Sequence, residues 1–235
     1  MSILYNGNMD NIVGRLRSLF PPHILDVVIG SLLGDARLEC RSKGIRTDIT
    51  ARFRVHHGDK QKEYVFWKYQ QLQDFVSRPP RSISWVNEKR NLKEISWYFH
   101  TKSSERLGII HEIFYKNGTK VLPKELFPLF TNRMLAIWFM DDGSNNGHSL
   151  TLNTHSLSFE NQQWLVAFFK ERYRIYPTIV KDRTQWKLAI GWNDMDSFLA
   201  IIEPFVPQCM SYKIKSPRND LFVFRKSLNA AEPRA

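Results

Sequence analysis

Two segments, Val28-Ile-Gly-Ser-Leu-Leu-Gly-Asp-Ala36 and Leu135-Ala-Ile-Trp-Phe-Met-Asp-Asp-Gly143, share an unusual pattern. Each predicts a compact apolar helix that ends on an aspartate followed by a small residue. An aspartate there faces the negative end of the helix dipole, which costs about 0.3–1 kcal/mol. A simple turn explains one such aspartate. Two in one chain favour a site, because helices packed side by side would bring carboxylates and helix carbonyls together, and hard divalent cations bind such oxygens.

Hairpins and further helices are expected on either side of these segments. Alternation of apolar and polar residues predicts strands over residues 49–56, 82–86, 94–100 and 185–192. Amphipathic spacing predicts helices over residues 60–76, 105–115, 159–173 and 195–205. Turns are expected at residues 89–91 and 181–183, and N-caps at Ser158 and at Asn193-Asp194. The order helix, hairpin, helix, hairpin, helix occurs twice, with a period of 142 − 35 = 107 residues.

The composition excludes several classes of protein. A chain of 235 residues fits one large domain or two of about 100 residues. With 43% hydrophobic residues it contains too much apolar side chain to be disordered, and no apolar run reaches the roughly 18 residues of a membrane helix. Only Cys40 and Cys209 are present, which argues against a disulfide framework and structural zinc. We therefore expect a folded protein without a membrane partner.

The net charge of +11 points to a nucleic-acid partner, because lysine and arginine provide most of the affinity for phosphates. The charge is concentrated on the predicted strands. Residues 37–62 contain eight Lys or Arg and three Asp or Glu, whereas residues 131–142 have a net charge of −1. We expect sheets with one apolar and one basic face, with four tryptophans in the sheet cores: Trp85, Trp97, Trp186 and Trp192.

Both aspartate-ending segments resemble the signature helix of LAGLIDADG homing endonucleases, and the chain is similar to single-chain, two-motif members of the omega-intron type. The resemblance covers nearly everything beyond about Asp26. It implies an α+β fold in which two pseudo-symmetric αββαββα halves pack through paired signature helices and carry antiparallel, saddle-shaped DNA-binding sheets. The expected divisions are an N-terminal extension (1–22), a first half (23–118), a linker (119–130) and a second half with a C-terminal tail (131–235).

Two departures from the family pattern concern the packing of the signature helices. Ala36 stands where the family usually has glycine. Ile137 and Trp138 make the second helix bulkier than the first, which has small residues at Gly30 and Gly34. The resemblance therefore implies an asymmetric helix contact.

The resemblance assigns the catalytic site residue by residue. Asp35 and Asp142 match the metal-binding aspartate of each motif, and the carbonyl groups of Ala36 and Gly143 are further expected ligands. Lys120 and Lys213 match the basic residue that reaches the active site in each half. Asp141 lies where alanine is usual and is not an expected ligand. No role is expected for the remaining histidines: His23, His57, His100, His111 and His148.

The expected cofactor is Mg²⁺, with Mn²⁺ as a substitute and Ca²⁺ binding without supporting cleavage; the number of ions stays open. DNA contacts are expected from polar residues of the hairpins, some to base edges and some to phosphates. These residues are Arg37, Arg41, Arg46, Arg52, Arg54, His56, Arg81, Lys89, Arg90, Lys93, Asn153, His155, Lys181, Arg183, Gln185, Lys187 and Lys215.

The function implied is that of a monomeric, site-specific endonuclease. It would hydrolyse both strands of a long, asymmetric DNA target, leave short 3′ overhangs and so propagate its intron, without an obligate protein partner. Two alternatives stay open: a maturase that binds its host intron RNA, and a non-catalytic DNA-binding protein on the same scaffold. As an organelle-encoded intron protein it is expected first in the mitochondrion, with the plastid and the bacterial cytoplasm as alternatives.

Overall fold

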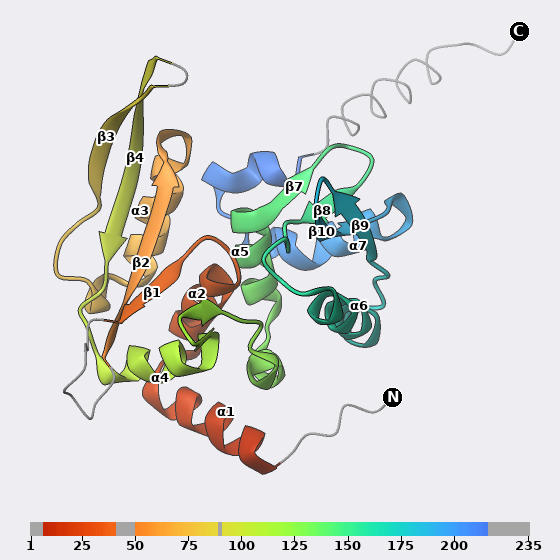
Figure 1. Ribbon diagram of the computed structural model, residues 1–235, viewed down its shortest axis with the longest axis horizontal. Coiled ribbons are helices and arrows are strands. Elements are labelled where there is room, and N and C mark those ends of the chain that lie inside the picture. The colour runs from red at the N-terminus through yellow and green to blue at the C-terminus, as the bar shows by residue number, and fades with distance from the viewer. Residues whose placement is uncertain (1–6, 41–49, 89–90, 216–235) are drawn as a thin grey trace, which may run out of the picture. The chain divides into compact units, whose positions relative to one another are not determined.

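The computed structural model describes residues 7–40, 50–88 and 91–215, without the side chains of residues 7–11. The chain forms two compact units, Met1–Asp141 and Asp142–Ala235 (Figure 1). Both combine helices with an antiparallel four-stranded sheet, which confirms the expected α+β class.

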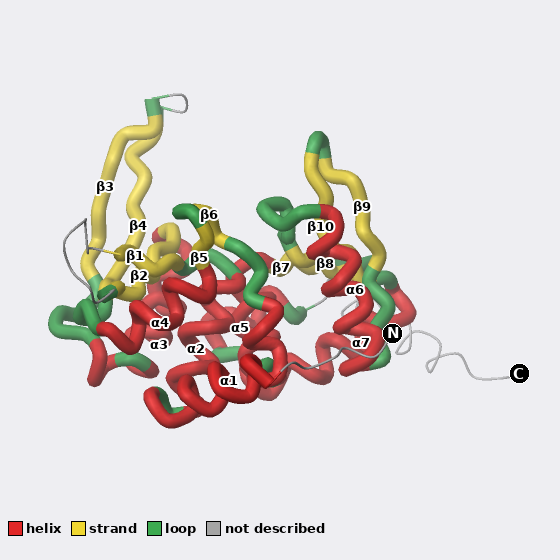
Figure 2. Tube along the Cα trace, turned by 60° about the horizontal axis from the view of Figure 1, so that its bottom comes forward, coloured by secondary structure: helices red, strands yellow, loops and turns green. Residues whose placement is uncertain are grey.

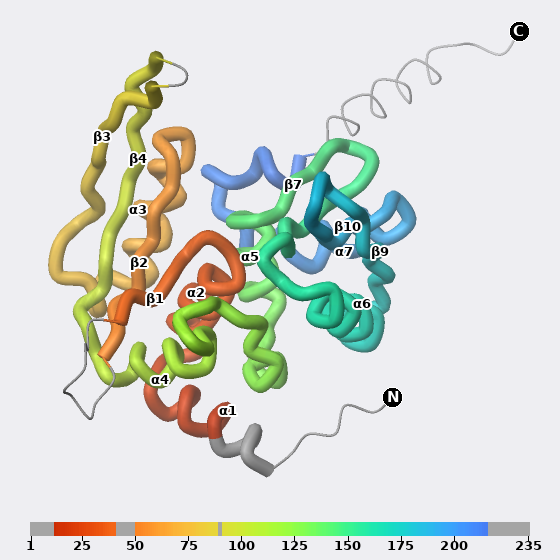
Figure 3. The backbone as a smooth tube through the Cα atoms, viewed as in Figure 1, coloured from red at the N-terminus to blue at the C-terminus, as the bar shows by residue number. Residues whose placement is uncertain are grey.

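The first unit contains a sheet in the order β1-β2-β4-β3. Helices α3 and α4 contact β2 of this sheet, and α3 also contacts β4 (Figure 3). The helices are α1 (Gly7–Leu19), α2 (Pro22–Leu33), α3 (Lys62–Gln71), α4 (Glu105–Phe114) and α5 (Asn132–Asp142). The strands are β1 (Arg37–Cys40), β2 (Ala51–Gly58), β3 (Arg81–Asn87), β4 (Leu92–His100), β5 (Tyr115–Lys116) and β6 (Thr119–Lys120). Short 3-10 helices are η1 (Asp59–Gln61), η2 (Gln73–Phe75) and η3 (Lys124–Leu129).

The second unit repeats this topology, with the sheet order β7-β8-β10-β9. Its strands are β7 (Gly143–Asn145), β8 (Leu150–Leu152), β9 (Thr178–Asp182) and β10 (Gln185–Ile190). Its helices are α6 (Phe159–Tyr173), α7 (Trp192–Ile202), η4 (Glu203–Phe205) and η5 (Gln208–Lys213). Counted from α2 and from α5, the chain therefore passes twice through helix, hairpin, helix, hairpin and helix, which confirms the predicted duplication.

Figure 2 shows that the hairpins β3–β4 and β9–β10 each extend beyond the helices of their own unit. Strand β2 shows the predicted separation of faces, since Phe53 and Val55 are buried and Arg52 and Arg54 lie on the other face. The outer part of β3–β4 has no such separation, because all but the last residue of β3 is exposed. The sheet is therefore amphipathic over the helices and exposed on both sides beyond them.

Helix α2 packs closely against α5 in the first unit. A Cβ atom on Gly30 would lie 2.8 Å from the Met134 carbonyl oxygen and 2.9 Å from Ile137 Cβ, and one on Gly34 would lie 2.4 Å from Asp141 Cβ. Glycine is therefore required on α2, where α5 contributes larger side chains. This is the asymmetric contact that the sequence predicts.

The variant Gly30→Ala is expected to lower the free energy of unfolding by about 1–3 kcal/mol, because overpacking at the Met134 backbone outweighs the higher helix propensity of alanine. Thermal or urea unfolding measures the change. Gly14→Ala in α1 is the matched control, since nothing lies within 4 Å of the added methyl group. Equal stability changes in the two variants would contradict the close helix contact.

Several local predictions need correction. Strand β9 continues to Asp182, so the turn shifts to Arg183, whose φ of 56° lies in the left-handed region. Helix α7 begins at Trp192 with Gly191 as its N-cap, because the carboxylate of Asp194 accepts a hydrogen bond from the Tyr176 backbone instead. The predicted cap at Ser158 is confirmed, since its side chain accepts from the Asn161 backbone N–H.

The predicted tryptophan positions are also largely wrong. Trp85, Trp186 and Trp192 are 44%, 37% and 47% exposed, because they lie on the outer hairpins or at the start of α7. Trp97 is half-buried against Phe66. Alternation along a strand predicts which residues share a face, but not how far the covering helices extend.

The predicted N-terminal extension and linker are both packed in the first unit. Leu16 of α1 is fully buried and α1 contacts η3, where Leu126 and Phe127 are also buried. The predicted halves, residues 23–118 and 131–235, are defined by the repeated order of helices and hairpins, and not by where the chain divides into compact units. Their boundaries remain a prediction. Among the described helices, none alone is long and apolar enough to cross a membrane; Ile12–Leu19 with Pro22–Leu33 passes that test only as a pair bent by 116°.

Candidate metal and nucleic-acid site

In the first unit, Asp35 follows Gly34, the residue that caps the end of α2. The helix closes with the Ala36 N–H donating to the Ser31 carbonyl at 2.9 Å, which leaves the Asp35 side chain 46% exposed. Lys120, on β6, donates from Nζ to the carbonyl oxygens of Gly34 and Ala36 at 2.8 and 3.1 Å. Lys120 lies 85 residues after Asp35 in the sequence (120 − 35), and its ammonium group contacts the backbone on both sides of this aspartate.

The second unit contains the same arrangement around Asp142. Its carbonyl oxygen accepts from the Asn153 N–H at 3.0 Å, which joins the end of α5 to the segment after β8. Lys213, at the end of η5, donates from Nζ to the Gly143 carbonyl oxygen at 2.6 Å. Lysine again contacts the backbone next to the aspartate.

These two clusters fit a hard divalent cation. Each offers a carboxylate and backbone carbonyl oxygens, and Mg²⁺ binds through one or two carboxylates together with phosphate and water oxygens. The carbonyl groups of Ala36 and Gly143, expected as ligands, also accept the lysine hydrogen bonds; a carbonyl oxygen has two lone pairs. Among the described residues, no group of three or more His, Cys, Asp or Glu could hold a metal ion by itself. Additional oxygens must then come from the substrate or solvent.

The basic face of the first sheet is organised around Glu39, which sequence reasoning did not select. Its carboxylate accepts hydrogen bonds from Arg37 at 2.8 and 3.0 Å, from Arg52 at 2.5 and 2.7 Å and from Arg54 at 3.2 Å. Burial alone would raise the pKa of Glu39, but the three guanidinium groups outweigh it and lower the pKa to about 2. Glu39 is therefore ionised and holds three predicted DNA-binding arginines together.

Other predicted residues extend this face. Tyr98 lies beneath two guanidinium groups, with Arg54 5.4 Å and Arg81 6.0 Å from its ring centre. His56 bonds Ser96 through Nε2 at 2.6 Å.

The basic face of the second sheet likewise surrounds a carboxylate. Asp182 Oδ2 lies 2.8 Å from Lys187 Nζ and 3.2 Å from His155 Nε2. The pKa of Asp182 is lowered, first by the hydrogen bond from Lys187 and then by its charge. Gln185 lies opposite Asp182 in the strand register and shares this face.

Strand alternation removes two predicted residues from these faces. Lys93 lies opposite Val86, on the other side of the sheet from Arg54. Lys181 lies opposite Trp186 and not on the face of Lys187. Lys215, which follows η5, is exposed. Four predicted contacts lie outside the described residues: Arg41, Arg46, Lys89 and Arg90.

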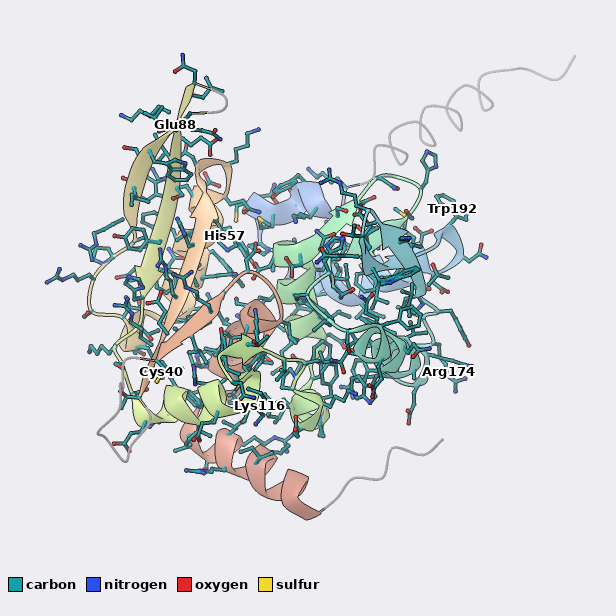
Figure 4. All side chains as sticks on the ribbon, in the orientation of Figure 1. Cys40, His57, Glu88, Lys116, Arg174 and Trp192 are labelled. Atoms are coloured by element: carbon teal, nitrogen blue, oxygen red, sulfur yellow. The ribbon has the colours of Figure 1, made fainter. Side chains whose placement is uncertain are left out.

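A buried polar cluster in the first unit was missed by sequence reasoning. Lys68 on α3 donates from Nζ to both oxygens of Asp141, at 2.7 and 2.9 Å, and both side chains have 0% exposure. His57 on β2, labelled in Figure 4, is also buried, and its Nε2 lies 3.4 Å from Lys68 Nζ. The only sequence signal was the charged residue at position 141, where the family pattern has alanine.

Comparison with known proteins identifies the family. The model of the LAGLIDADG DNA endonuclease family matches residues 25–198. DNA endonuclease I-ChuI of Chlamydomonas applanata is 29% identical over 208 residues, which are 80% of this chain and 93% of that protein. Cytochrome b mRNA maturase bI2 of Saccharomyces cerevisiae is 27% identical over 88% of this chain, which spans about half (50%) of the maturase.

Solved structures show the same fold. The homing endonuclease I-WcaI, bound to its DNA recognition sequence, aligns with a TM-score of 0.72 and 21% identity, over 91% of this chain and 96% of that one. I-DmoI in complex with DNA and Ca aligns with a TM-score of 0.51 and 15% identity, over 83% of this chain and 98% of that one. Since the family model covers most of the sequence and includes both aspartate-ending helices, the chain belongs to the LAGLIDADG DNA endonuclease family.

Proposed function

We propose that this protein is a site-specific homing endonuclease that hydrolyses both strands of a long, asymmetric DNA target with Mg²⁺, leaving short 3′ overhangs. One observation carries the proposal. In each unit a distant lysine donates to the backbone carbonyl next to the aspartate that follows or ends an apolar helix. A purely structural helix end would not need a carboxylate and a lysine hydrogen-bonded to the adjacent backbone in both repeats.

Each residue has a distinct part in the proposed reaction. Asp35 and Asp142 would hold the divalent ions, which supply an activated water and neutralise charge on the phosphate. Lys120 and Lys213 act as fixed cations that stabilise the negative charge developing on the phosphate oxygens. The arginines around Glu39 and the residues around Asp182 bind the DNA backbone and base edges, so that the cleaved phosphates are held in place.

The relatives support the choice of substrate and cofactor. I-WcaI was solved on its DNA recognition sequence, and I-DmoI was solved with DNA and Mn and with DNA and Ca. We propose Mg²⁺ as the working ion, Mn²⁺ as a substitute and Ca²⁺ as an ion that permits binding only. We also propose that one monomer suffices, because its two repeats provide one aspartate and one lysine for each strand.

The proposal is tested by incubating the full chain with a library of DNA sites that includes the intronless form of its own gene locus. With Mg²⁺ we expect one family of sequences to be cut on both strands, and with EDTA we expect none. Absence of any metal-dependent cut in the library would overturn the nuclease proposal.

The second candidate function is RNA maturation. The named maturase relatives favour it, although the chain spans only about half of the yeast protein. Retained Asp35 and Asp142 favour catalysis without excluding a second role. Splicing of the host intron RNA with and without the purified protein separates the two, since an endonuclease alone leaves the splicing rate unchanged. A non-catalytic DNA-binding protein is the third alternative, and it would bind its target without cutting it.

Lys120→Met and Lys213→Met are each expected to lower the cleavage rate about 100-fold, because each removes one preorganised cation. DNA binding should change less, since many other cations contact the backbone. Lys116→Met is the matched control: its Nζ bonds the Glu112 carbonyl on an exposed surface, and cleavage should stay at the unmodified rate. Single-turnover cleavage under excess protein measures all three, and an unchanged rate in both catalytic variants would contradict the assigned role.

Glu39→Gln is expected to loosen the specificity of DNA binding. Removing one negative charge should steepen the dependence of log K on log salt by about one unit, because the arginines then neutralise more phosphate charge. The ratio of specific to non-specific affinity should fall, since the arginines lose their common anchor. Glu125→Gln is the control, because Glu125 is an exposed residue of η3. Fluorescence anisotropy at several salt concentrations gives both values, and identical slopes in the two variants would be inconsistent with the role of Glu39.

A further inference from the structure

The outer part of the hairpin β3–β4 exposes large apolar side chains. They are Ile83, Trp85, Val86, Leu92 and Ile95, with exposed fractions of 49%, 44%, 62%, 59% and 39%. This part of the hairpin extends beyond the helices of its own unit, towards Glu88 in Figure 4. Large apolar side chains that stay exposed together in a folded protein mark an interaction surface.

The strand register assigns three of these residues to one face of the hairpin. Residues that pair directly across antiparallel strands share a face, and successive residues alternate between faces. Ile83 lies opposite Ser96, and Trp85 and Leu92 lie on the same side of the hairpin. Ser96 Oγ bonds His56 at 2.6 Å, so this side continues the basic face of the first sheet.

The other two residues, Val86 and Ile95, lie on the opposite face of the hairpin. Trp97, two residues beyond Ile95 on β4, packs against Phe66 of α3 with the ring centres 5.7 Å apart. This is therefore the face that the helices cover at its inner end. The hairpin thus has exposed apolar residues on both sides, but only one side is continuous with the arginines.

The apolar part of the basic face is suited to base edges rather than to phosphates. Between Arg81 and the turn, its described residues include no cation, and their polar members are Asn87, Glu94 and Ser96. The Asn87 amide donates to the Glu94 carboxylate at 2.7 Å. Phosphate affinity comes from lysine and arginine. Of the groups that base pairs present in the major groove, the apolar one is the C5 methyl group of thymine.

We propose that Ile83, Trp85 and Leu92 recognise thymine in the major groove of the DNA target, by contact with its C5 methyl group. This inference rests on the proposed DNA-binding function. The hairpin is a two-stranded antiparallel ribbon, and the major groove admits such a ribbon. Arg54 and Arg81, on the same face, supply the phosphate contacts that position it. The target then contains T·A pairs where the outer hairpin binds.

The test selects bound sequences from a pool of random DNA duplexes with the full chain in Ca²⁺, the ion proposed to permit binding without cleavage. Each thymine of an enriched duplex is then replaced in turn by deoxyuridine, which keeps the base pair and removes only the methyl group. Fluorescence anisotropy measures the affinity for each duplex.

Two double variants are compared with the unmodified protein. One carries Ile83→Ser with Trp85→Ser, and the matched control carries Val86→Ser with Ile95→Ser on the opposite face. Serine is compatible with these strands, because β3 and β4 already contain it at positions 82, 84 and 96. Circular dichroism checks that each variant keeps the fold.

For at least one thymine, we expect deoxyuridine to lower the affinity of the unmodified protein and of the control about 4-fold, the effect of exposing one buried methyl group. In the Ile83→Ser, Trp85→Ser variant this loss should be absent, since the apolar partner of the methyl group has been removed. Deoxyuridine effects that are the same in both double variants, or no effect in the unmodified protein, would overturn the inference.

Other outcomes separate this inference from its alternatives. A second copy of the chain on this face would appear in sedimentation of the free protein as a dimer that Ile83→Ser with Trp85→Ser abolishes, and this result would overturn the inference. A pool without any enriched sequence would overturn the proposed function and the inference together. An enriched duplex that shows the expected deoxyuridine effects but is not cut in Mg²⁺ would contradict only the proposed hydrolysis.

Discussion

Replacing Lys68 by methionine is expected to lower the free energy of unfolding by about 3–5 kcal/mol, because it leaves the Asp141 carboxylate buried without its cation. Lys68 Nζ donates two hydrogen bonds to that carboxylate, at 2.7 and 2.9 Å. Methionine fills a similar volume, so loss of packing contributes little. Urea unfolding followed by circular dichroism measures the change.

A double variant separates charge from packing. Adding Asp141→Ala to Lys68→Met removes the uncompensated charge, and we expect the double variant to be more stable than Lys68→Met alone. Lys62→Met on the same helix is the control, with an expected loss below about 1 kcal/mol because Lys62 is exposed and its ammonium group lies over the Trp97 ring. A further loss of stability on adding Asp141→Ala would show that the pair is not coupled as described.

Asp142→Asn is expected to lower the rate of double-strand cleavage by at least about 1,000-fold, because loss of one of the two proposed carboxylate ligands would remove several kcal/mol of stabilisation from the transition state. Binding of the same DNA in Ca²⁺ should stay within about 10-fold of the unmodified protein, since the sheet residues proposed to bind DNA are unchanged. Rapid-quench cleavage and anisotropy binding measure the two effects separately.

Asp196→Asn is the matched control for this variant, because Asp196 is an exposed aspartate on α7 in the same unit. It should change neither cleavage nor binding. If Asp142→Asn lost binding as well as cleavage, Asp142 would be structural, and retained cleavage would exclude it as a metal ligand.

The sequence predicted the repeated features of the fold well. Apolar residues recur every three to four residues in a helix and every second residue in a strand, because one face of each element is buried. These local patterns predicted both apolar helices and the alternating strands, and so the order of elements. Helix α2 was predicted to start at Val28 but starts at Pro22, since the segment before it is apolar too and proline fits the first helical turn.

Among residues that come into contact only in the folded chain, some were predicted and others were missed. The family resemblance pointed to Lys120 and Lys213, although 85 and 71 residues separate them from the aspartates (120 − 35 and 213 − 142). His57 and Lys68 were missed because no pattern along the chain joins β2, α3 and the end of α5. Glu39 was missed for a related reason. Its ion pair with Arg52 forms only because β1 pairs with β2, and the sequence does not show that pairing.

The central claim is that one monomer cuts both strands of DNA with metal ions held at Asp35 and Asp142. The most direct measurement uses the DNA target isolated from the library, labelled separately on each strand, at one protein per duplex. With Mg²⁺ the account predicts that both strands are cut at offset positions that leave 3′ overhangs, and that EDTA or the double variant Asp35→Asn with Asp142→Asn stops both cuts. Cleavage that continues in EDTA or in the double variant, or no cleavage of either strand in Mg²⁺, would contradict it.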